Sequence, residues 1–347
     1  MSKISFLHHR SDYNWLKVCV FSVLVVGLLL SRAFSTTALA QAKQKKTTQK
    51  VVQKPPAKTP ARPAKKATKS DDEPQPPENI VLETKDGVRL NATFFPGTKG
   101  NQSVPVILLH MWKGSRGDYN ILAPYLQRLG HAVLVPDLRG HGESIHARGA
   151  SQPLEADKLP SQQFLRMVDC DMETLKKFLM EKNNEGELNI DKLCIVGSEM
   201  GAVVALDWAR MDWSWPPLNT GKQGQDVKAL VLISPQWAFH GLSAKRAMAL
   251  RPMLHELSTM ILVGGENSRA VQQAKRFEAI FRRYSPGASA EKDPDRTLWY
   301  IPLKTSLQGT KMLGSSTLRV EPGIAKFIKW RLVDQSFPWK NRDPNKQ

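Results

Sequence analysis

The chain contains the stretch Leu193-Cys194-Ile195-Val196-Gly197-Ser198-Glu199-Met200-Gly201, in which an apolar run ends at a turn with a glycine on either side. The four apolar residues at its start predict a strand that is covered on both faces. Residues 200–210 predict the helix that follows. The stretch therefore predicts a buried strand that passes through a sharp turn directly into a helix.

Strand and helix patterns alternate on both sides of this stretch. Asp86-Gly87 lies between two strand-like segments and indicates a hairpin. The other expected strands are 80–83, 88–95, 104–110, 131–136, 229–233, 260–263 and 298–301, and the other expected helices are 119–129, a long helix capped by Ser161, 270–284 and 323–333. Strands separated by helical segments require a parallel sheet with right-handed crossovers. We expect one α/β domain, 76–335, followed by a polar C-terminal tail, 336–347.

Three motifs lie in order along this domain: VILLH at 106–110, VPDLRGHGES at 135–144 and IVGSEMG at 195–201. The second resembles the D-x-R-G-H-G-x-S loop of the α/β-hydrolase fold superfamily, and the third resembles its G-x-S-x-G nucleophile elbow. The resemblance covers 78–333. It implies the α/β-hydrolase fold, with a mostly parallel eight-stranded sheet, helices on both faces and no large cap domain.

The elbow departs from the family pattern at its centre. Gly197 and Gly201 match the two glycines, which are needed because strand and helix nearly touch at the turn. The central position, which holds the nucleophile in the family, is Glu199. Ser198 falls one place early, where its side chain is expected to point into the interior, so it is a poor substitute.

The resemblance places the other two triad positions on Ser268, in Gly-Glu-Asn-Ser at 265–268, and on Gln308, in the loop 305–310. No histidine follows His255 anywhere in the chain. A glutamine amide cannot take up and return a proton near neutral pH, and Ser268 has no charge to orient a base. The resemblance therefore implies a pseudo-hydrolase with a degenerate triad, acting as a non-catalytic binding or scaffold protein.

An enzyme of unconventional mechanism is the alternative. Glu199 could act as nucleophile or base on an ester or similar substrate, with help from His110 or His141. An ester formed on Glu199 would still need a base to activate water.

The resemblance also implies an oxyanion hole formed by the backbone amides of Met200 and of Met111 or Trp112. Because Glu199 begins a helix, we expect its carboxylate to occupy or face this hole and to stay ionised. One expectation is a polar cleft lined by Glu199, Trp112, Ser268 and Gln308 that holds a cationic or sugar-like ligand. The other is a filled, inert remnant.

The remaining histidines indicate no metal site and no cofactor. His110 and His141 are expected to tie loops together by hydrogen bonds. His131, His240 and His255 have no carboxylate or cysteine at metal-ligand spacing.

Two further features concern surface and core. Cys170 and Cys194 are expected to be two separate buried thiols. The segment Trp-Ser-Trp-Pro-Pro at 213–217 is a second candidate contact surface, unless it folds back onto the sheet edge.

The charge of the chain is concentrated at its N-terminus. Of the formal net charge of +18, residues 1–40 carry +3, residues 41–70 carry +10, and the remaining 277 residues carry only +5. The body is therefore nearly balanced. Nucleic-acid binding is disfavoured, because no aromatic residue interrupts the basic run to stack on bases.

Residues 1–40 have the layout of a secretory signal peptide. Arg10 and Lys17 precede an uncharged apolar run, 18–30, and Ala38-Leu39-Ala40 follows, so cleavage is expected after Ala40. An uncleaved membrane anchor is the alternative, although thirteen apolar residues are fewer than the ~20 that span a bilayer. Either way we expect an exported protein, in the periplasm, on the envelope or secreted.

Residues 41–75 are rich in Lys, Pro, Ala, Thr and Gln and predict an extended disordered tether. The tether could be a solvated spacer, or it could adhere to anionic polymers or lipid headgroups of the envelope.

Overall fold

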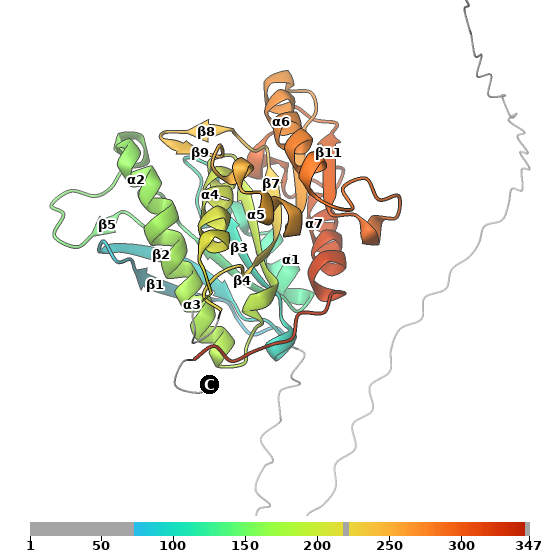
Figure 1. Cartoon of the computed structure of the whole chain (residues 1–347). Coiled ribbons are helices and arrows are strands. Elements are labelled where there is room, and N and C mark those ends of the chain that lie inside the picture. The colour runs from blue at the N-terminus through green and yellow to red at the C-terminus, as the bar shows by residue number, and fades with distance from the viewer. Residues whose placement is uncertain (1–72, 218–221, 344–347) are drawn as a thin grey trace, which may run out of the picture. The chain divides into compact units, whose positions relative to one another are not determined.

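The computed structural model describes residues 73–217 and 222–343 (Figure 1). The predicted signal peptide, 1–40, lies outside the described residues, and so does the predicted tether as far as residue 72. Within the described ranges, no helix combines the length and the hydrophobicity needed to cross a membrane.

A nine-stranded sheet runs through the body (Figure 1). Eight strands follow the order β1-β2-β4-β3-β6-β7-β10-β11, and the short β5 pairs with β2. The strands of this sheet are β1 (Glu78–Glu83), β2 (Val88–Phe95), β3 (Pro105–Leu109), β4 (Ala132–Pro136), β5 (His146–Ala147), β6 (Leu193–Ser198), β7 (Val227–Ile233), β10 (Ser258–Gly264) and β11 (Leu298–Leu303). Strand β2 is antiparallel to β1, β4 and β5, and the other neighbours are parallel. The mostly parallel sheet is confirmed.

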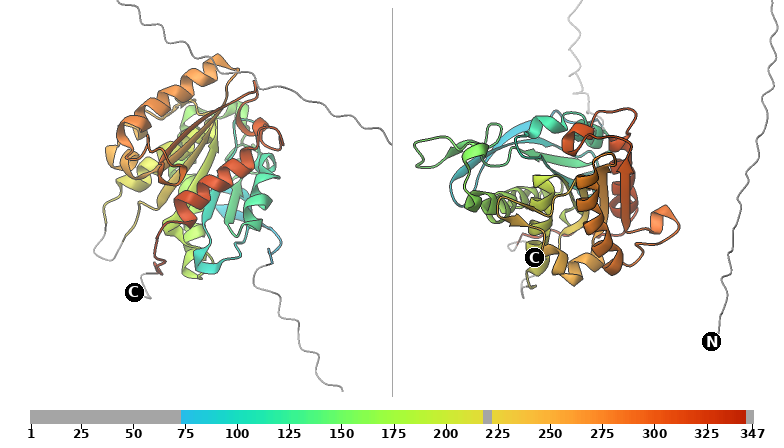
Figure 2. Two further views of the ribbon diagram at one scale, coloured as in Figure 1. Left: turned by 90° about the vertical axis from the view of Figure 1, so that its right-hand side faces the viewer. Right: turned by 90° about the horizontal axis from the view of Figure 1, so that it is seen from above.

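Helices cover both faces of the sheet. They are α1 (Leu122–Arg128), α2 (Ser161–Arg166), α3 (Met172–Asn184), α4 (Met200–Ser214), α5 (Arg251–Glu256), α6 (Ser268–Tyr284) and α7 (Val320–Ile328). Helices α1 and α7 cover one face, and α3, α4 and α6 cover the other; the left view of Figure 2 shows the red α7 in front of the strands. Between β7 and β10 the described chain forms the small pair β8 (Ala238–Phe239) and β9 (Leu242–Ser243), a 3-10 turn and α5, not a large cap domain.

The central strands owe their uninterrupted apolar sequences to this two-sided cover. On β3, Ile107 and Leu109 point into the core under α3 and α4, whereas Val106 and Leu108 point into the core under α1 and α7. Successive side chains of a strand face opposite sides, so a strand between two helical layers must be apolar throughout.

Three expected helices differ in detail from the structure. The expected helix 323–333 is α7 followed by a π-helical turn, Lys329–Val333. In place of the expected helix 119–129, the chain forms a 3-10 turn, Arg116–Tyr119, and then the shorter helix α1. Ser161 does not cap α2, because Pro160 occupies the cap position and Ser161 is the first helical residue. A π-helical turn, Met167–Asp171, separates α2 from α3 and interrupts the predicted long helix.

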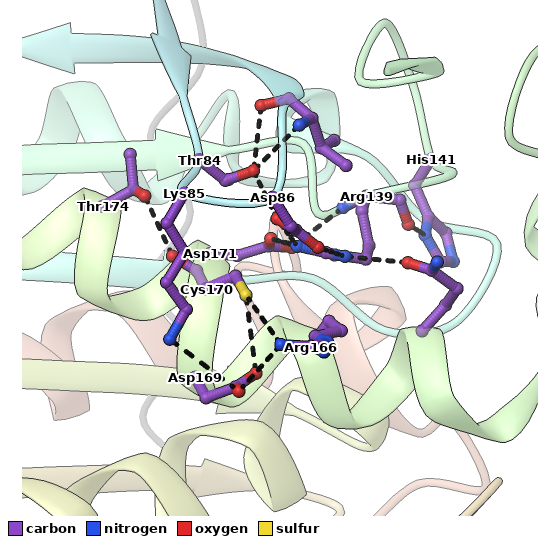
Figure 3. A network of polar contacts seen from close by, with 12 residues as sticks. Thr84, Lys85, Asp86, Arg139, His141, Arg166, Asp169, Cys170, Asp171 and Thr174 are labelled. Carbon is purple, nitrogen blue, oxygen red and sulfur yellow. Dashed lines mark hydrogen bonds and ion pairs between the residues drawn. The ribbon is translucent and has the colours of Figure 1, made fainter. Parts of the chain in front are cut away.

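The π-helical turn brings Asp171 to the buried Arg139 of the loop after β4 (Figure 3). Arg139 donates from Nε to Asp171 Oδ1 at 2.9 Å and from Nη1 to Asp86 Oδ2 at 2.7 Å and Gln163 Oε1 at 2.8 Å. Burial acts to raise the pKa of Asp86, but Arg139 holds it well below its usual value. One guanidinium thus joins the β1–β2 turn, the loop after β4 and the α2–α3 segment.

The end of the chain packs against the body as far as Arg342. The Asn189 side chain donates to the carbonyl of Phe337 at 2.8 Å, and Arg342 Nη1 donates to Asp226 Oδ1 at 2.5 Å. Asp226 also lies 3.0 Å from Lys176 Nζ. Residues 336–343, the described part of the expected polar tail, are therefore attached to the body, in part through a buried ion-pair cluster.

The two cysteines and the tryptophan-rich segment can be placed as well. Cys170 and Cys194 are free and buried, as predicted. Trp213 is buried at the end of α4 and donates from Nε1 to the carbonyl of Val227 at 3.0 Å. This tryptophan therefore folds back onto the body and does not form an exposed patch.

Candidate functional site

The predicted elbow is present between β6 and α4. Glu199 has φ +47° and ψ −104°, a conformation that a residue with a side chain rarely adopts. A Cβ atom on Gly201 would lie within 3.0 Å of the carbonyl oxygens of Leu109 and His110, and one on Gly197 would meet Gly201 and Ala202 at similar distances. The two glycines thus let β6, α4 and β3 approach one another closely enough to hold Glu199 in the turn.

The Glu199 carboxylate does not occupy the predicted oxyanion hole. Among the described residues its one hydrogen bond comes from Gln236 Nε2 at 3.4 Å, and no backbone amide donates to it. The side chain lies against Gly309, and so does that of Met111: a Cβ atom on Gly309 would be 3.1 Å from Glu199 Oε1 and 2.9 Å from Met111 Sδ. Burial raises the pKa of Glu199, while the positive charge of Lys311 opposes that rise. A carboxylate held by helix-end amides would have its pKa lowered, and no such bond offsets the effect of burial on Glu199 in the described structure.

Ser198 points into the interior, as the sequence predicts. It is fully buried, and its Oγ lies 3.0 Å from the hydroxyl of Tyr119. The Tyr119 hydroxyl also donates to the carbonyl of Leu109 at 2.9 Å. Because the Tyr119 hydroxyl donates its proton to Leu109, Ser198 Oγ is the donor in the hydrogen bond between Ser198 and Tyr119.

Gln308 lies beside the elbow, where one hydroxyl group and three backbone groups fix its amide. Ser234 Oγ donates to Gln308 Oε1 at 2.6 Å, and Gln308 Nε2 donates to the carbonyl of Gly264 at 3.0 Å. Ser234 Oγ in turn accepts from the amide of Gly309 at 3.0 Å. The side chain acts as a cross-link between β7, β10 and the loop after β11.

Ser268 and Trp112 lie away from this group. Ser268 is exposed at the first position of α6, where Asn267 is the capping residue. The Trp112 ring packs 5.7 Å from Phe239 and 5.9 Å from His240. The expected cleft therefore contains Glu199 and Gln308 but neither Ser268 nor Trp112.

A cavity of about 520 Å³ opens next to Glu199. Its lining comes from the elbow, the loop after β7, the first turns of α6 and the loop after β11: Glu199, Ser234, Pro235, Gln236, Trp237, Ala238, Asn267, Arg269, Ala270, Gln273, Arg276 and Gln308. The volume is in the range of small-molecule sites. The residues of α6 were not foreseen, although arginines seven positions apart on one helix signal a shared face.

Another cavity, of about 360 Å³, lies at Arg116, Asp137 and Glu143. Arg116 forms ion pairs with both acids, and the amide of Glu143 donates to Asp137 at 3.0 Å. All three charged groups are paired with one another, but one arginine faces two carboxylates, so the lining keeps a net negative charge.

His110 and His141 have the loop-holding roles that the sequence indicates. The amide of Leu138 donates to His110 Nε2 at 3.0 Å, so Nδ1 carries the proton and donates to the carbonyl of Met111 at 2.7 Å. Burial, together with the nearby His141, lowers the pKa of His110 to about 4. His141 Nδ1 lies 3.0 Å from the carbonyl of Arg139. Neither ring is hydrogen-bonded to Glu199 in the described structure.

In residues 73–217 and 222–343, no cluster of three or more His, Cys, Asp or Glu side chains is arranged to bind a metal ion.

Curated relatives match part of the chain. The chain is 29% identical to an uncharacterized protein of Mycobacterium tuberculosis over 131 residues, 38% of this chain and 40% of that protein. It is 33% identical to the sn-1-specific diacylglycerol lipase ABHD11 of Danio rerio over 129 residues, 37% of this chain and 33% of that protein. The matches span about 40% or less of the length of these curated relatives.

Solved structures show the same architecture. A thermostable carboxyl esterase of Bacillus coagulans aligns with a TM-score of 0.51 at 10% identity, covering 74% of this chain and 99% of the esterase. The protein DcsB, in complex with a substrate analogue, aligns with a TM-score of 0.50 at 11% identity over the same shares. At such identities the likeness shows the fold alone. The sequence model described as alpha/beta hydrolase fold matches residues 104–315. With the elbow and sheet order in place over that range, the chain belongs to the α/β-hydrolase fold family.

Proposed function

We propose that this protein is a pseudo-hydrolase of the α/β-hydrolase fold, which binds a small ligand in the cavity beside Glu199 without hydrolysing it by a triad mechanism. The observation that carries this proposal is the state of Gln308. Its amide occupies the place where the resemblance puts the general base, and both its oxygen and its nitrogen are engaged by Ser234 and Gly264. An amide so held can neither accept nor return a proton near neutral pH.

The other triad positions support the same proposal. Glu199 keeps the strained elbow conformation, but no imidazole is hydrogen-bonded to it among the described residues. Ser268 is exposed outside the cavity. An ester on Glu199 would have no base beside it to activate water.

Short acyl esters test the proposal directly. We expect the purified protein to hydrolyse 4-nitrophenyl acetate and butyrate no faster than its Glu199→Gln variant, because neither has a general base at the elbow. Intact mass after incubation with an ester-trapping phosphonate should be unchanged. Turnover or labelling that Glu199→Gln abolishes would show instead that Glu199 is a nucleophile or base, which is the alternative function.

Export is a proposal that rests on the sequence of residues 1–40. We expect the protein, made in a bacterial host with its own N-terminus, to be recovered from the cell envelope or medium with Gln41 as its first residue, as mass spectrometry would detect. An intact N-terminus in a membrane fraction would indicate an anchor, and one in the cytosol would refute export. Removing residues 41–75 behind the same signal asks whether the basic segment retains the protein on the envelope or is only a spacer.

A further inference from the structure

One face of α6 forms a wall of the cavity beside Glu199. Arg269, Gln273 and Arg276 are spaced four and three residues apart, so they lie on the same side of the helix. All three line the cavity. Gln273 Oε1 accepts from the backbone amide of Trp237 at 3.1 Å, which ties the loop after β7 to the helix at this wall.

The guanidinium of Arg276 is held in place by an aromatic ring. Its Cζ atom lies 3.4 Å from the ring centroid of Trp237, and that ring in turn packs against Phe277 at 5.2 Å. Stacking uses the flat face of a guanidinium and leaves the N–H groups at its edge free. Those edge groups match the two oxygens of a carboxylate or phosphate. Arg276 is thus oriented before any ligand arrives.

Neither arginine of this wall is neutralised. No acidic residue in the described structure forms an ion pair or hydrogen bond with Arg269 or Arg276, whereas Arg282 on the same helix pairs with Glu278. Across the lining, the one acidic side chain is Glu199, whose burial favours its neutral form. The lining therefore carries excess positive charge on α6, next to the apolar side chains of Pro235, Ala238 and Ala270.

We propose that this cavity binds a small organic anion, whose carboxylate or phosphate is held by Arg276 and Arg269 and whose apolar part rests on the loop after β7. The inference rests on the proposed ligand-binding role of the cavity and names the ligand class. A cationic ligand, one of the classes expected from the sequence, is disfavoured because it would meet two uncompensated arginines. Glu199 and Gln236 also line the cavity and suit a hydroxyl or amide of the ligand.

Four six-carbon probes of one shape and different charge test this class: hexanoate, hexyl phosphate, hexanamide and hexylammonium. By titration calorimetry at low ionic strength we expect at least one anion to bind about tenfold or more tightly than hexanamide, because charge-assisted bonds to guanidinium are stronger than neutral ones. Hexylammonium should bind more weakly than the preferred anion and more weakly than hexanamide. The preferred anion decides between a carboxylate and a phosphate ligand, and its affinity should fall as salt is added.

Matched variants locate the site. Arg276→Gln and Arg269→Gln should each weaken anion binding about tenfold. Lys275→Gln removes the same charge from the same helix outside the lining, and it should leave binding nearly unchanged. Circular dichroism of each variant serves as the control for folding.

Several outcomes would overturn the inference. Equal binding of hexanoate, hexyl phosphate and hexanamide, or anion binding that Lys275→Gln weakens as much as Arg276→Gln, would show that the wall does not select anions. Absence of binding by every probe would overturn it too. The proposed function fails on a different measurement, namely ester turnover that depends on Glu199.

Discussion

Replacing Arg139 by alanine is expected to lower the free energy of unfolding by about 3–5 kcal/mol, because it leaves a buried carboxylate without its partner. Arg139 and Asp171 are both fully buried, and their closest nitrogen and oxygen atoms are 2.5 Å apart. Burial raises the pKa of Asp171, and Arg139 opposes that rise. Without the arginine, Asp171 must either take up a proton or remain charged in the interior, and both cost stability.

Urea unfolding followed by circular dichroism measures this effect. Arg148→Ala is the control, because the Arg148–Glu83 pair is largely exposed and exposed pairs contribute about 0–1 kcal/mol. Replacing both Arg139 and Asp171 by apolar residues should cost less than the two single changes added together, since no unpaired charge then remains between them. A cost for Arg139→Ala as small as that for Arg148→Ala would contradict the role of this arginine as the link between three segments.

The second large effect is expected at the elbow, where Gly201→Ala should destabilise the protein by about 3 kcal/mol or more. The added methyl group would lie within 3.0 Å of the carbonyl oxygens of Leu109 and His110. Both are backbone atoms of the segment that includes β3, so relief of the clash requires β3 and α4 to move apart. That movement would also disturb Glu199 and the adjacent cavity.

Gly323→Ala provides a matched control for this substitution. Gly323 lies inside α7, and a Cβ atom there would meet nothing within 4 Å. The same change should therefore stabilise the protein by about 0.5–1 kcal/mol, because alanine loses less backbone entropy in a helix than glycine does. Thermal and urea unfolding of the two variants should shift in opposite directions. Two shifts of the same sign would show that close approach at Gly201 is not what requires a glycine.

The order of elements could be predicted from the sequence because it depends on short-range patterns. The apolar run before Gly197 and the spacing of Gly197 and Gly201 predicted a strand, a turn and a helix, and each is present. The absence of any histidine after His255 is likewise a property of the sequence. Such features involve residues within a few positions of one another, whose backbone preferences and periodicity are local.

The contacts that the site residues make could be found only in the tertiary structure. The Glu199 carboxylate was expected to occupy or face the oxyanion hole, and among the described residues it accepts from Gln236 and from no backbone amide. Ser268 was expected in the cleft and is exposed outside it. Side-chain direction at a strained turn or a helix start depends on which distant loops pack there. No local pattern reports that packing.

What the sequence determined by itself is therefore the family fold, the glutamate at the centre of the elbow and the absence of any histidine after His255. What the tertiary structure alone decided is the composition of the cavity. Arg276 comes to lie near Glu199 because β7, β10 and β6 are neighbours in the sheet and α6 follows β10. Residues 77 positions apart meet only after parallel strands have assembled, and the charge that meets a ligand depends on that assembly.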